Sequence, residues 1–213
     1  MSTIRPAAVA GMFYPDDARE LRSQIKEFIA HVSKRKVKGK VRGIVSPHAG
    51  YDYSGFTAAH GYSMLRGEKF ETVVVVSPSH REFFNGVSVY PGDAYETPLG
   101  IVEVNRKLRD ELLAQGEFIV ASEAGHRAEH ALEVQLPFLQ EVLGEFTLLP
   151  LVIGDQKPEI CFALGEALAN VLQDESALLV ASSDLSHFYT ADVADKLDDV
   201  MIEDVNEFDY ELL

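Results

Sequence analysis

Apolar residues recur along the chain in two alternating patterns, a helical spacing and short continuous runs. The first helical pattern covers residues 16–33, where Leu21, Ile25 and Ile29 recur four positions apart. The continuous runs are rich in β-branched residues, which is typical of strands buried on both faces of a parallel sheet. Helices that alternate with such strands predict an α/β fold. The predicted strands cover residues 41–45, 72–76, 147–153 and 177–181, and the other predicted helices cover residues 105–114, 128–143, 158–172 and 190–205.

Two further runs, residues 86–90 and 101–104, alternate apolar and polar positions more clearly. Such alternation is typical of strands with one solvated face, so we expect an antiparallel edge or a hairpin there. No internal repeat and no linker interrupts the pattern. A chain of 213 residues without such an interruption is expected to form one domain.

Charge and cysteine content narrow the class of protein. Acidic residues outnumber basic ones by 34 to 19, which gives a formal net charge of -15. This balance argues against nucleic acid and anionic membranes as partners, because both bind basic surfaces. A single cysteine excludes an intrachain disulfide. The sequence contains no apolar run of the roughly 18 residues that a membrane span needs, and its N-terminus has no signal-peptide pattern, so we expect a cytoplasmic protein.

Three predicted strands end in small polar residues that lead to a histidine. The first leads to His48, the second to His80, and the third to Asp184 and His187. Because the carboxyl ends of parallel strands meet at one edge of a sheet, where open α/β folds bind ligands, we expect these groups to share a site. His48 and His80 are then candidate metal ligands or catalytic groups. Asp184 and His187 are candidates to act beside them.

A fourth candidate element is the segment with His130 and Glu133, which are three positions apart and would share one face of the predicted helix 128–143. This spacing suits a metal or a proton relay, and it suits an ordinary salt-bridged helix face equally well. His126, just before this helix, is either a loop residue or part of the site. Cys161 lies in an apolar helical stretch and is expected to be a buried structural thiol.

Several metals and reactions fit these residue types. Two imidazoles and a carboxylate describe the site of non-haem Fe(II) enzymes, and imidazole also suits zinc and copper. A further histidine near the metal can act as general acid and base, and Asp184 can orient it. Hydrolysis by zinc-bound water is a weaker hypothesis, because zinc would need a third ligand from Asp184, Glu133 or His187. Motifs typical of dinucleotide binding and of serine hydrolases are absent.

Five motifs follow one another over nearly the whole chain. They read RPAAVAGMFYP at residues 5–15, SPHAGY at 46–51, SPSH at 77–80, EHALEVQLP at 129–137 and SSDLSH at 182–187. In this order they resemble the Memo family, whose bacterial and archaeal members are often called AmmeMemoRadiSam system protein B. The resemblance implies a three-layer α/β fold with a central mixed, mostly parallel sheet, similar to that of class III extradiol dioxygenases.

The resemblance also implies roles for site residues. It makes His48 and His80 metal ligands, with Fe(II) the first candidate metal and copper or zinc the alternatives. It makes Asp184 and His187 a polar pair in the same pocket, with His187 as acid and base, and it makes His130 and Glu133 a third pocket segment.

Two kinds of function follow from the resemblance. The first is iron- or copper-dependent redox or dioxygenase-like activity on an unknown substrate. The alternative is a non-catalytic adaptor that keeps the pocket as a site for a ligand or peptide. The implied partners are a small molecule or peptide and a radical SAM protein of the same system.

The sequence departs from the family pattern at its end. Family members continue with a C-terminal segment whose cysteine supplies a third metal ligand. Cys161 lies in a different segment and does not match it. The Memo-like domain over residues 1–213 is therefore expected to be incomplete at its C-terminal end, with its third metal ligand undetermined and an apolar face or sheet edge exposed.

Overall fold

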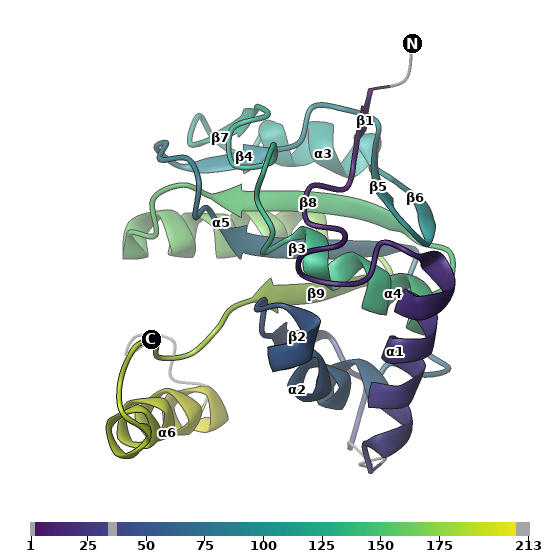
Figure 1. The fold of residues 1–213 in the computed structure, drawn as a ribbon. Coiled ribbons are helices and arrows are strands. Elements are labelled where there is room, and N and C mark those ends of the chain that lie inside the picture. Colours follow the sequence, from purple (N-terminus) through teal and green to yellow (C-terminus); the bar gives the residue numbers. More distant parts are fainter. Residues whose placement is uncertain (1–2, 34–37, 208–213) are drawn as a thin grey trace. The chain divides into compact units, whose positions relative to one another are not determined.

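A computed structural model describes residues 3–33 and 38–207 of the chain (Figure 1). The chain divides into two compact units, Met1–Ser183 and Asp184–Leu213. Each unit is described by itself below. The expectation of one domain over residues 1–213 stays a prediction.

A six-stranded sheet forms the centre of the first unit, in the order β2-β9-β3-β8-β4-β7. The first four strands run parallel to one another, whereas β4 is antiparallel to β8 and parallel to β7. The mixed, mostly parallel sheet that the sequence predicts is confirmed. Its strands are β2 (Gly43–Ser46), β3 (Thr72–Pro78), β4 (Val87–Val89), β7 (Ile119–Ala121), β8 (Thr147–Ile153) and β9 (Ala177–Ser182).

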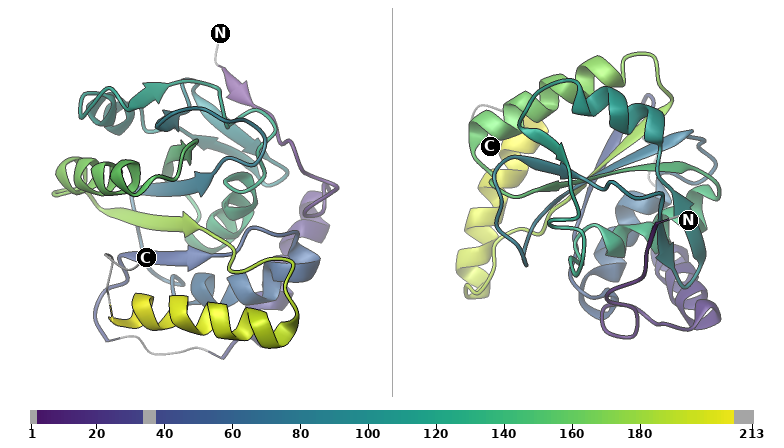
Figure 2. Two further views of the ribbon diagram at one scale, coloured as in Figure 1. Left: turned by 90° about the vertical axis from the view of Figure 1, so that its left-hand side faces the viewer. Right: turned by 90° about the horizontal axis from the view of Figure 1, so that it is seen from above.

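Helices cover both faces of this sheet. Along β3, Val73 and Val75 pack into the core shared with α1, α2 and α4, whereas Val74 packs into the core shared with α3 and α5. Alternate side chains of a strand point to opposite faces, so one continuous apolar run contributes to both cores. The view from above in Figure 2 shows these three layers of the first unit. The helices are α1 (Ala18–His31), α2 (Tyr51–Ser63), α3 (Arg106–Leu113), α4 (Leu136–Leu143) and α5 (Pro158–Val171).

A second, three-stranded sheet lies beside the main one in the order β1-β5-β6. β1 (Ile4–Arg5) is parallel to β5 (Ala94–Thr97), and β5 pairs antiparallel with β6 (Gly100–Glu103). β4 is buried throughout and lies between β8 and β7, so the expected solvated edge or hairpin is wrong for the first run. The two runs each have an antiparallel neighbour, β8 for β4 and β5 for β6. They belong to different sheets, because the first is β4 and the second is β6.

Two helices, α1 and α3, begin at side-chain caps. The side chain of Asp17 accepts hydrogen bonds from the amides of Arg19 and Glu20 at the start of α1, and Asn105 caps α3 in the same way. The predicted helix 128–143 is wrong in its first part, because a short 3₁₀ turn, Glu133–Gln135, precedes α4. Before that turn, a glutamate side chain accepts the backbone amides of its next two residues, and such local bonds compete with a helix.

Burial of the strands and of Cys161 can be compared with the sequence predictions. β3 and β8 are buried on both faces as expected, but β2 and β9 alternate, and Val45 and Leu179 stay exposed. The first unit therefore covers only one face of these two strands. Cys161 is exposed, so the prediction of a buried thiol is wrong. Among residues 3–33 and 38–207, no helix is long and apolar enough to cross a membrane.

In its described part, residues 184–207, the second unit contains one helix, α6 (Ala191–Glu207). Its position agrees with the helix predicted over residues 190–205. Before the helix, the amide of Ser186 donates a hydrogen bond to the side chain of Asp198. This bond fixes the start of the unit against its own helix.

Candidate metal centre

The candidate site lies where three parallel strands end side by side. β9 lies between β2 and β3, so the carboxyl ends of all three strands are neighbours. His48 follows the end of β2 by two residues, and His80 follows the end of β3 by two residues. Their ring centroids are 5.1 Å apart. The strand ends that the sequence singled out therefore bring these two histidines together.

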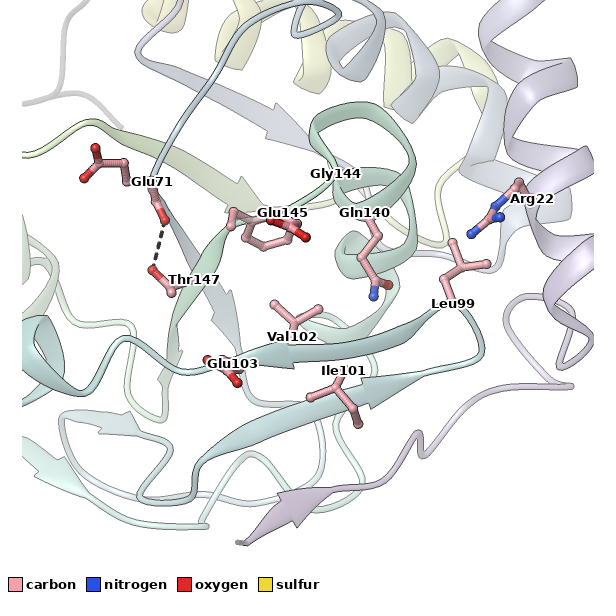
Figure 3. Close-up of a pocket in the computed structure, with 11 residues that line it drawn as sticks. Arg22, Glu71, Leu99, Ile101, Val102, Glu103, Gln140, Gly144, Glu145 and Thr147 are labelled. Atoms are coloured by element: carbon pink, nitrogen blue, oxygen red, sulfur yellow. Dashed lines mark hydrogen bonds between the residues drawn. The ribbon is translucent and has the colours of Figure 1, made fainter.

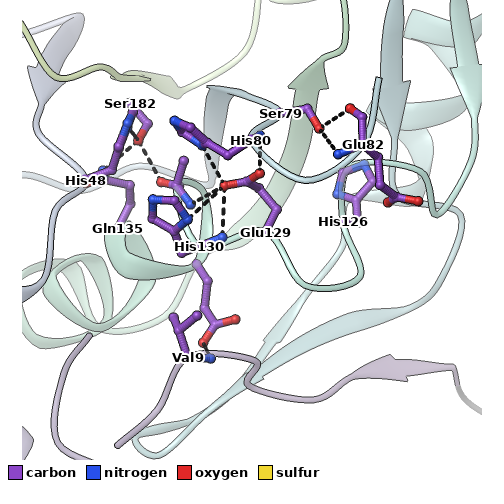
Figure 4. A network of polar contacts seen from close by, with 12 residues as sticks. Val9, His48, Ser79, His80, Glu82, His126, Glu129, His130, Gln135 and Ser182 are labelled. Atoms are coloured by element: carbon purple, nitrogen blue, oxygen red, sulfur yellow. Dashed lines mark hydrogen bonds and ion pairs between the residues drawn. The ribbon is translucent and has the colours of Figure 1, made fainter. Parts of the chain in front are cut away.

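A third histidine joins them from a loop rather than from a strand end. His130 lies between β7 and the 3₁₀ turn, and its ring centroid is 4.7 Å from that of His80 and 5.7 Å from that of His48. One nitrogen of each ring lies within 4.8 Å of the others, a group that can hold a metal ion. Figure 4 shows His80 and His130 on either side of the Glu129 carboxylate, with His48 beside them. Phe13 packs against the outer side of His130 at 4.5 Å.

The Glu129 carboxylate is hydrogen-bonded to one of the three rings and lies close to a second. It is 1% exposed, and one oxygen accepts a hydrogen bond from Nδ1 of His80 at 3.0 Å. The same oxygen lies 3.2 Å from Nδ1 of His130. The amides of His80, His130 and Ala131 also donate to this carboxylate. Because a carboxylate can only accept, Nδ1 of His80 carries a proton.

Electrostatics favour an ionised Glu129 beside a neutral His130. Burial raises the pKa of Glu129, but donors from Ala131 and His80 outweigh it and hold this pKa below its ordinary value. Burial lowers the pKa of His130, and the neighbouring His80 and His48 lower it further against the opposing pull of Glu129. A neutral imidazole is the form that binds a metal, so His130 is ready to act as a ligand at neutral pH.

His48 is held by a separate chain of buried hydrogen bonds. Its Nδ1 lies 3.0 Å from the hydroxyl oxygen of Ser182, the last residue of β9. That hydroxyl donates to the carbonyl of Ala131 at 2.6 Å and accepts from Nε2 of Gln135 at 2.8 Å. The hydroxyl of Tyr62 donates to the amide oxygen of Gln135 at 2.6 Å. His48 is 4% exposed, and the Ser182 hydroxyl that contacts it belongs to a hydrogen-bond network that joins four different segments.

Glu133 has a different environment from the one that the sequence suggested. Residues 128–132 are not helical, so the expectation that His130 and Glu133 share one helix face is wrong. The Glu133 carboxylate is fully buried and accepts from Nη1 of Arg5 at 2.6 Å and from the hydroxyl of Tyr14 at 2.6 Å. The amides of Ala8 and Val9 also donate to it. These contacts join Glu133 to the N-terminal segment, and its role as a pocket residue stays a prediction.

Arg5 extends this connection to the loop that carries the site. Its guanidinium donates to the carbonyl oxygens of Glu129 and His126 as well as to Glu133, and it stacks 4.8 Å over the ring of Tyr95. Arg5 is itself buried. The N-terminal motif and the motif around His130 thus form one buried polar cluster.

The sequence left His126 as either a loop residue or part of the site, and the structure distinguishes the two. It is buried, and its Nε2 contacts the carbonyl of Ser88, so Nε2 carries the proton. Its Nδ1 then accepts from the hydroxyl of Tyr95. Burial lowers the pKa of His126 to about 3. His126 is a neutral structural histidine outside the group of three.

Asp184 and His187 belong to the second unit. Nε2 of His187 lies 3.2 Å from a carboxylate oxygen of Asp184, so the two form the expected polar pair. Within the first unit, the end of β9 contributes Ser182 to the site rather than a histidine. The catalytic roles of Asp184 and His187 stay predictions.

A separate cavity lies elsewhere in the first unit. It measures about 720 Å³, and its lining includes Arg22, Glu71, Glu103 and Glu145 (Figure 3). The hydroxyl of Thr147 donates to the carbonyl of Glu71 in its wall. The lining contains no histidine and no cysteine, so volume alone does not locate the metal chemistry.

Sequence reasoning missed Glu129 and the pair of Ser182 and Gln135 as supports of the histidines. For Glu129 a signal existed, since a glutamate next to His130 and just before an apolar run can bind local amides. For Gln135 the sequence held none, because its partners are 47 and 88 positions away.

Comparison with known proteins finds similarity over nearly the whole chain. The family model described as Memo-like protein matches residues 5–213. A MEMO1 family protein of Aquifex aeolicus is 41% identical over 211 residues, which cover 99% of this chain and 77% of the relative. A MEMO1 family protein of Thermoplasma volcanium is 37% identical over 209 residues, which cover 98% of this chain and 76% of the relative.

Proposed function

The chain belongs to the Memo-like protein family, and on that premise we propose that it binds one divalent metal ion through His48, His80 and His130. The observation that carries the proposal is the convergence of three imidazoles within 4.8 Å, two of them against one buried carboxylate. Fe(II) is the first candidate metal, and copper and zinc also suit imidazole ligands. A bound iron would supply redox chemistry there.

The donor set fits such an ion with small adjustments. Imidazole nitrogens lie about 2.0–2.1 Å from zinc, and tetrahedral ligands at that distance are roughly 3.3 Å apart. The three nitrogens must therefore move somewhat closer than their limit of 4.8 Å. The side chain of His80 is 42% exposed, which leaves it room to rotate. His48 and His130 are more enclosed and set the position of the site.

The residues around the three histidines would prepare the site for the metal. Glu129 orients His80 through a hydrogen bond and places a negative charge next to His80 and His130, which would partly balance a divalent cation. His80 is the partly exposed side of the cluster, so a small molecule or a peptide would approach from there. We propose redox or dioxygenase-like activity on such a ligand as the function of the site.

A non-catalytic adaptor is the second candidate. The observation in its favour is that the three clustered ligands are all histidines, whereas the Fe(II) oxygenase site combines two histidines with a carboxylate. In that case the metal and its pocket would serve only to bind a ligand or peptide. A radical SAM protein of the same system is a further proposed partner, and the cytoplasm is the proposed location.

Anaerobic Fe(II) binding tests the proposal. The wild-type chain and the double variant His48→Ala/His80→Ala would be equilibrated with Fe(II), and bound iron would be counted per chain. We expect one iron in the wild type and a large loss in the variant. Equal binding in both proteins, or none in either, would refute the metal site.

Exposure of the loaded protein to oxygen then separates the two candidate functions. Oxygen consumption that depends on bound iron supports an oxidoreductase. Stable iron without oxygen consumption supports the adaptor. An Arg106→Ala variant, which removes an exposed ion pair with Asp93, serves as a matched control for surface mutation.

A further inference from the structure

The buried hydrogen bonds behind His48 determine where its proton lies. We propose that Ser182 and Gln135 are positioning residues that lock His48 with its proton on Nδ1, so that Nε2 carries the lone pair for a metal. As a statement about metal binding this rests on the proposed function. The position of the proton on His48 is inferred only from contacts between buried groups.

The contacts of the Ser182 hydroxyl determine which atom supplies each hydrogen. A hydroxyl has one hydrogen to donate and two lone pairs to accept. The carbonyl of Ala131 can only accept, so its 2.6 Å contact uses the single hydrogen of Ser182. Nε2 of Gln135 donates to one lone pair. The 3.0 Å contact with Nδ1 of His48 therefore needs a hydrogen from the imidazole.

The orientation of the Gln135 amide is fixed independently. Its Nε2 lies 3.0 Å from the carbonyl oxygen of Pro47. If the amide were flipped, its oxygen would face that carbonyl, and two acceptors would meet in a buried site. In the observed orientation, the hydroxyl of Tyr62 donates to the amide oxygen, so both the oxygen and the nitrogen of the Gln135 amide are hydrogen-bonded. Gln135 therefore acts as a donor to Ser182 and cannot exchange roles with it.

The consequence is a preorganised ligand. A histidine that could place its proton on either nitrogen would bind a metal through Nε2 only part of the time. The network of Ser182, Gln135 and Tyr62 removes that choice at His48, as Glu129 does at His80. Two rings that follow different strands thus each carry a proton on Nδ1 through unrelated partners.

Nitrogen NMR on the metal-free protein tests the proposal directly. Long-range proton–nitrogen spectra of ¹⁵N-histidine-labelled protein, recorded at pH 8, distinguish the two neutral forms of each ring. We expect His48 to carry its proton on Nδ1 in the wild type and to lose that preference in Ser182→Ala. Ser88→Ala is the matched control, because Ser88 is also buried and also donates to a carbonyl, that of Ser122.

Metal affinity gives a second reading in the same proteins. Titration with Co(II), followed by its visible absorption, is expected to show affinity 10–100-fold lower in Ser182→Ala than in Ser88→Ala. Gln135→Met removes the amide that donates to the Ser182 hydroxyl, so the preference of His48 for a proton on Nδ1 should weaken, and an unchanged preference would contradict the role of Gln135. This variant keeps the proposal testable if Ser182→Ala does not fold.

Two results would overturn the proposal: a proton on Nε2 of His48 in the wild type, or unchanged Co(II) affinity in Ser182→Ala. If the wild type takes up no metal, the proposed function fails. The NMR result on the metal-free protein still decides where the proton lies, so the two failures are distinguishable.

Discussion

Glu129 and Glu133 lie four positions apart, and their carboxylates are 1% and 0% exposed. Both are surrounded by donors, but the donors differ. Glu129 receives the His80 imidazole and amides of its own loop, whereas Glu133 receives Arg5, Tyr14 and amides of the N-terminal segment. One carboxylate therefore organises ligands, and the other fastens a distant part of the chain.

The different donors indicate different roles for the buried carboxylates of Glu129 and Glu133. Beside the histidines, a carboxylate needs donors that keep it ionised and still leave the far ring nitrogens available. Beside the N-terminal segment, it needs only to be saturated, and Arg5 supplies the balancing charge at 2.6 Å. We therefore expect changes at Glu133 to affect stability first and changes at Glu129 to affect metal binding first.

The largest effect is expected at Glu133. Glu133→Ala leaves the guanidinium of Arg5 buried without its countercharge, which typically costs about 3–5 kcal/mol of unfolding free energy. Urea unfolding of the metal-free protein measures it. Glu141→Ala is the control, because its pairs with Arg22 and Lys26 are partly exposed and should contribute less than about 1 kcal/mol. Similar losses of unfolding free energy in the two variants would contradict a stabilising buried ion pair between Arg5 and Glu133.

Glu129→Gln is expected to act mainly on the metal. It keeps the shape of the side chain but removes the negative charge beside His80 and His130, so Co(II) affinity should fall about 10–100-fold. Its unfolding free energy should fall less than that of Glu133→Ala. Glu82→Gln is the control, since Glu82 accepts the amide of Gly125 outside the histidine group. Unchanged affinity in Glu129→Gln would show that the carboxylate does not support the ligands.

A pH effect on stability is expected from His126. Its pKa is about 3 in the folded protein and about 6.5 in the unfolded chain, so between these values only the unfolded state binds the proton. Folding stability contributed by this residue is complete above pH 6.5 and is lost as the pH falls, by at most about 1.4 kcal/mol per pH unit.

Urea unfolding of the metal-free protein between pH 7 and pH 5 measures this slope, in a range where carboxylates contribute less. The variant His126→Gln cannot titrate and should show a shallower dependence. An equal slope in both proteins would contradict the assignment of His126 as a buried neutral ring.

The smallest effect is expected at Cys161. Its thiol is exposed and is not part of the clustered ligands found among the described residues. Cys161→Ser should leave Co(II) affinity unchanged and unfolding free energy within about 0.5 kcal/mol. A clear loss of affinity would implicate the sulfur and contradict the three-histidine set.

The strand ends of the sheet were predictable because they depend on local pattern. An apolar run that stops at serine and proline ends a buried strand, and parallel neighbours place such ends together, so the meeting of His48 and His80 follows from sequence. His130 was noticed but was assigned to a helix, since the apolar stripe of the following residues suggested one. Local amide bonds to Glu129 prevent the helix from starting there.

The supporting residues were not predictable for a different reason. Glu133 meets Arg5 across 128 positions, and Ser182 meets His48 across 134 positions. No periodicity links residues at such separations, because their contact depends on how the sheet and the N-terminal segment pack. The short strands β1, β5 and β7 were missed as well, since two to four residues carry too little pattern.

X-ray absorption of the iron-loaded protein tests the three-histidine site most directly. The spectrum counts imidazole rings and detects sulfur among the atoms bound to the metal. The account predicts three imidazoles and no sulfur in the wild type, and two imidazoles in His130→Ala. A spectrum with sulfur, or with the same number of imidazoles in both proteins, would contradict the assignment of His48, His80 and His130 as the metal ligands.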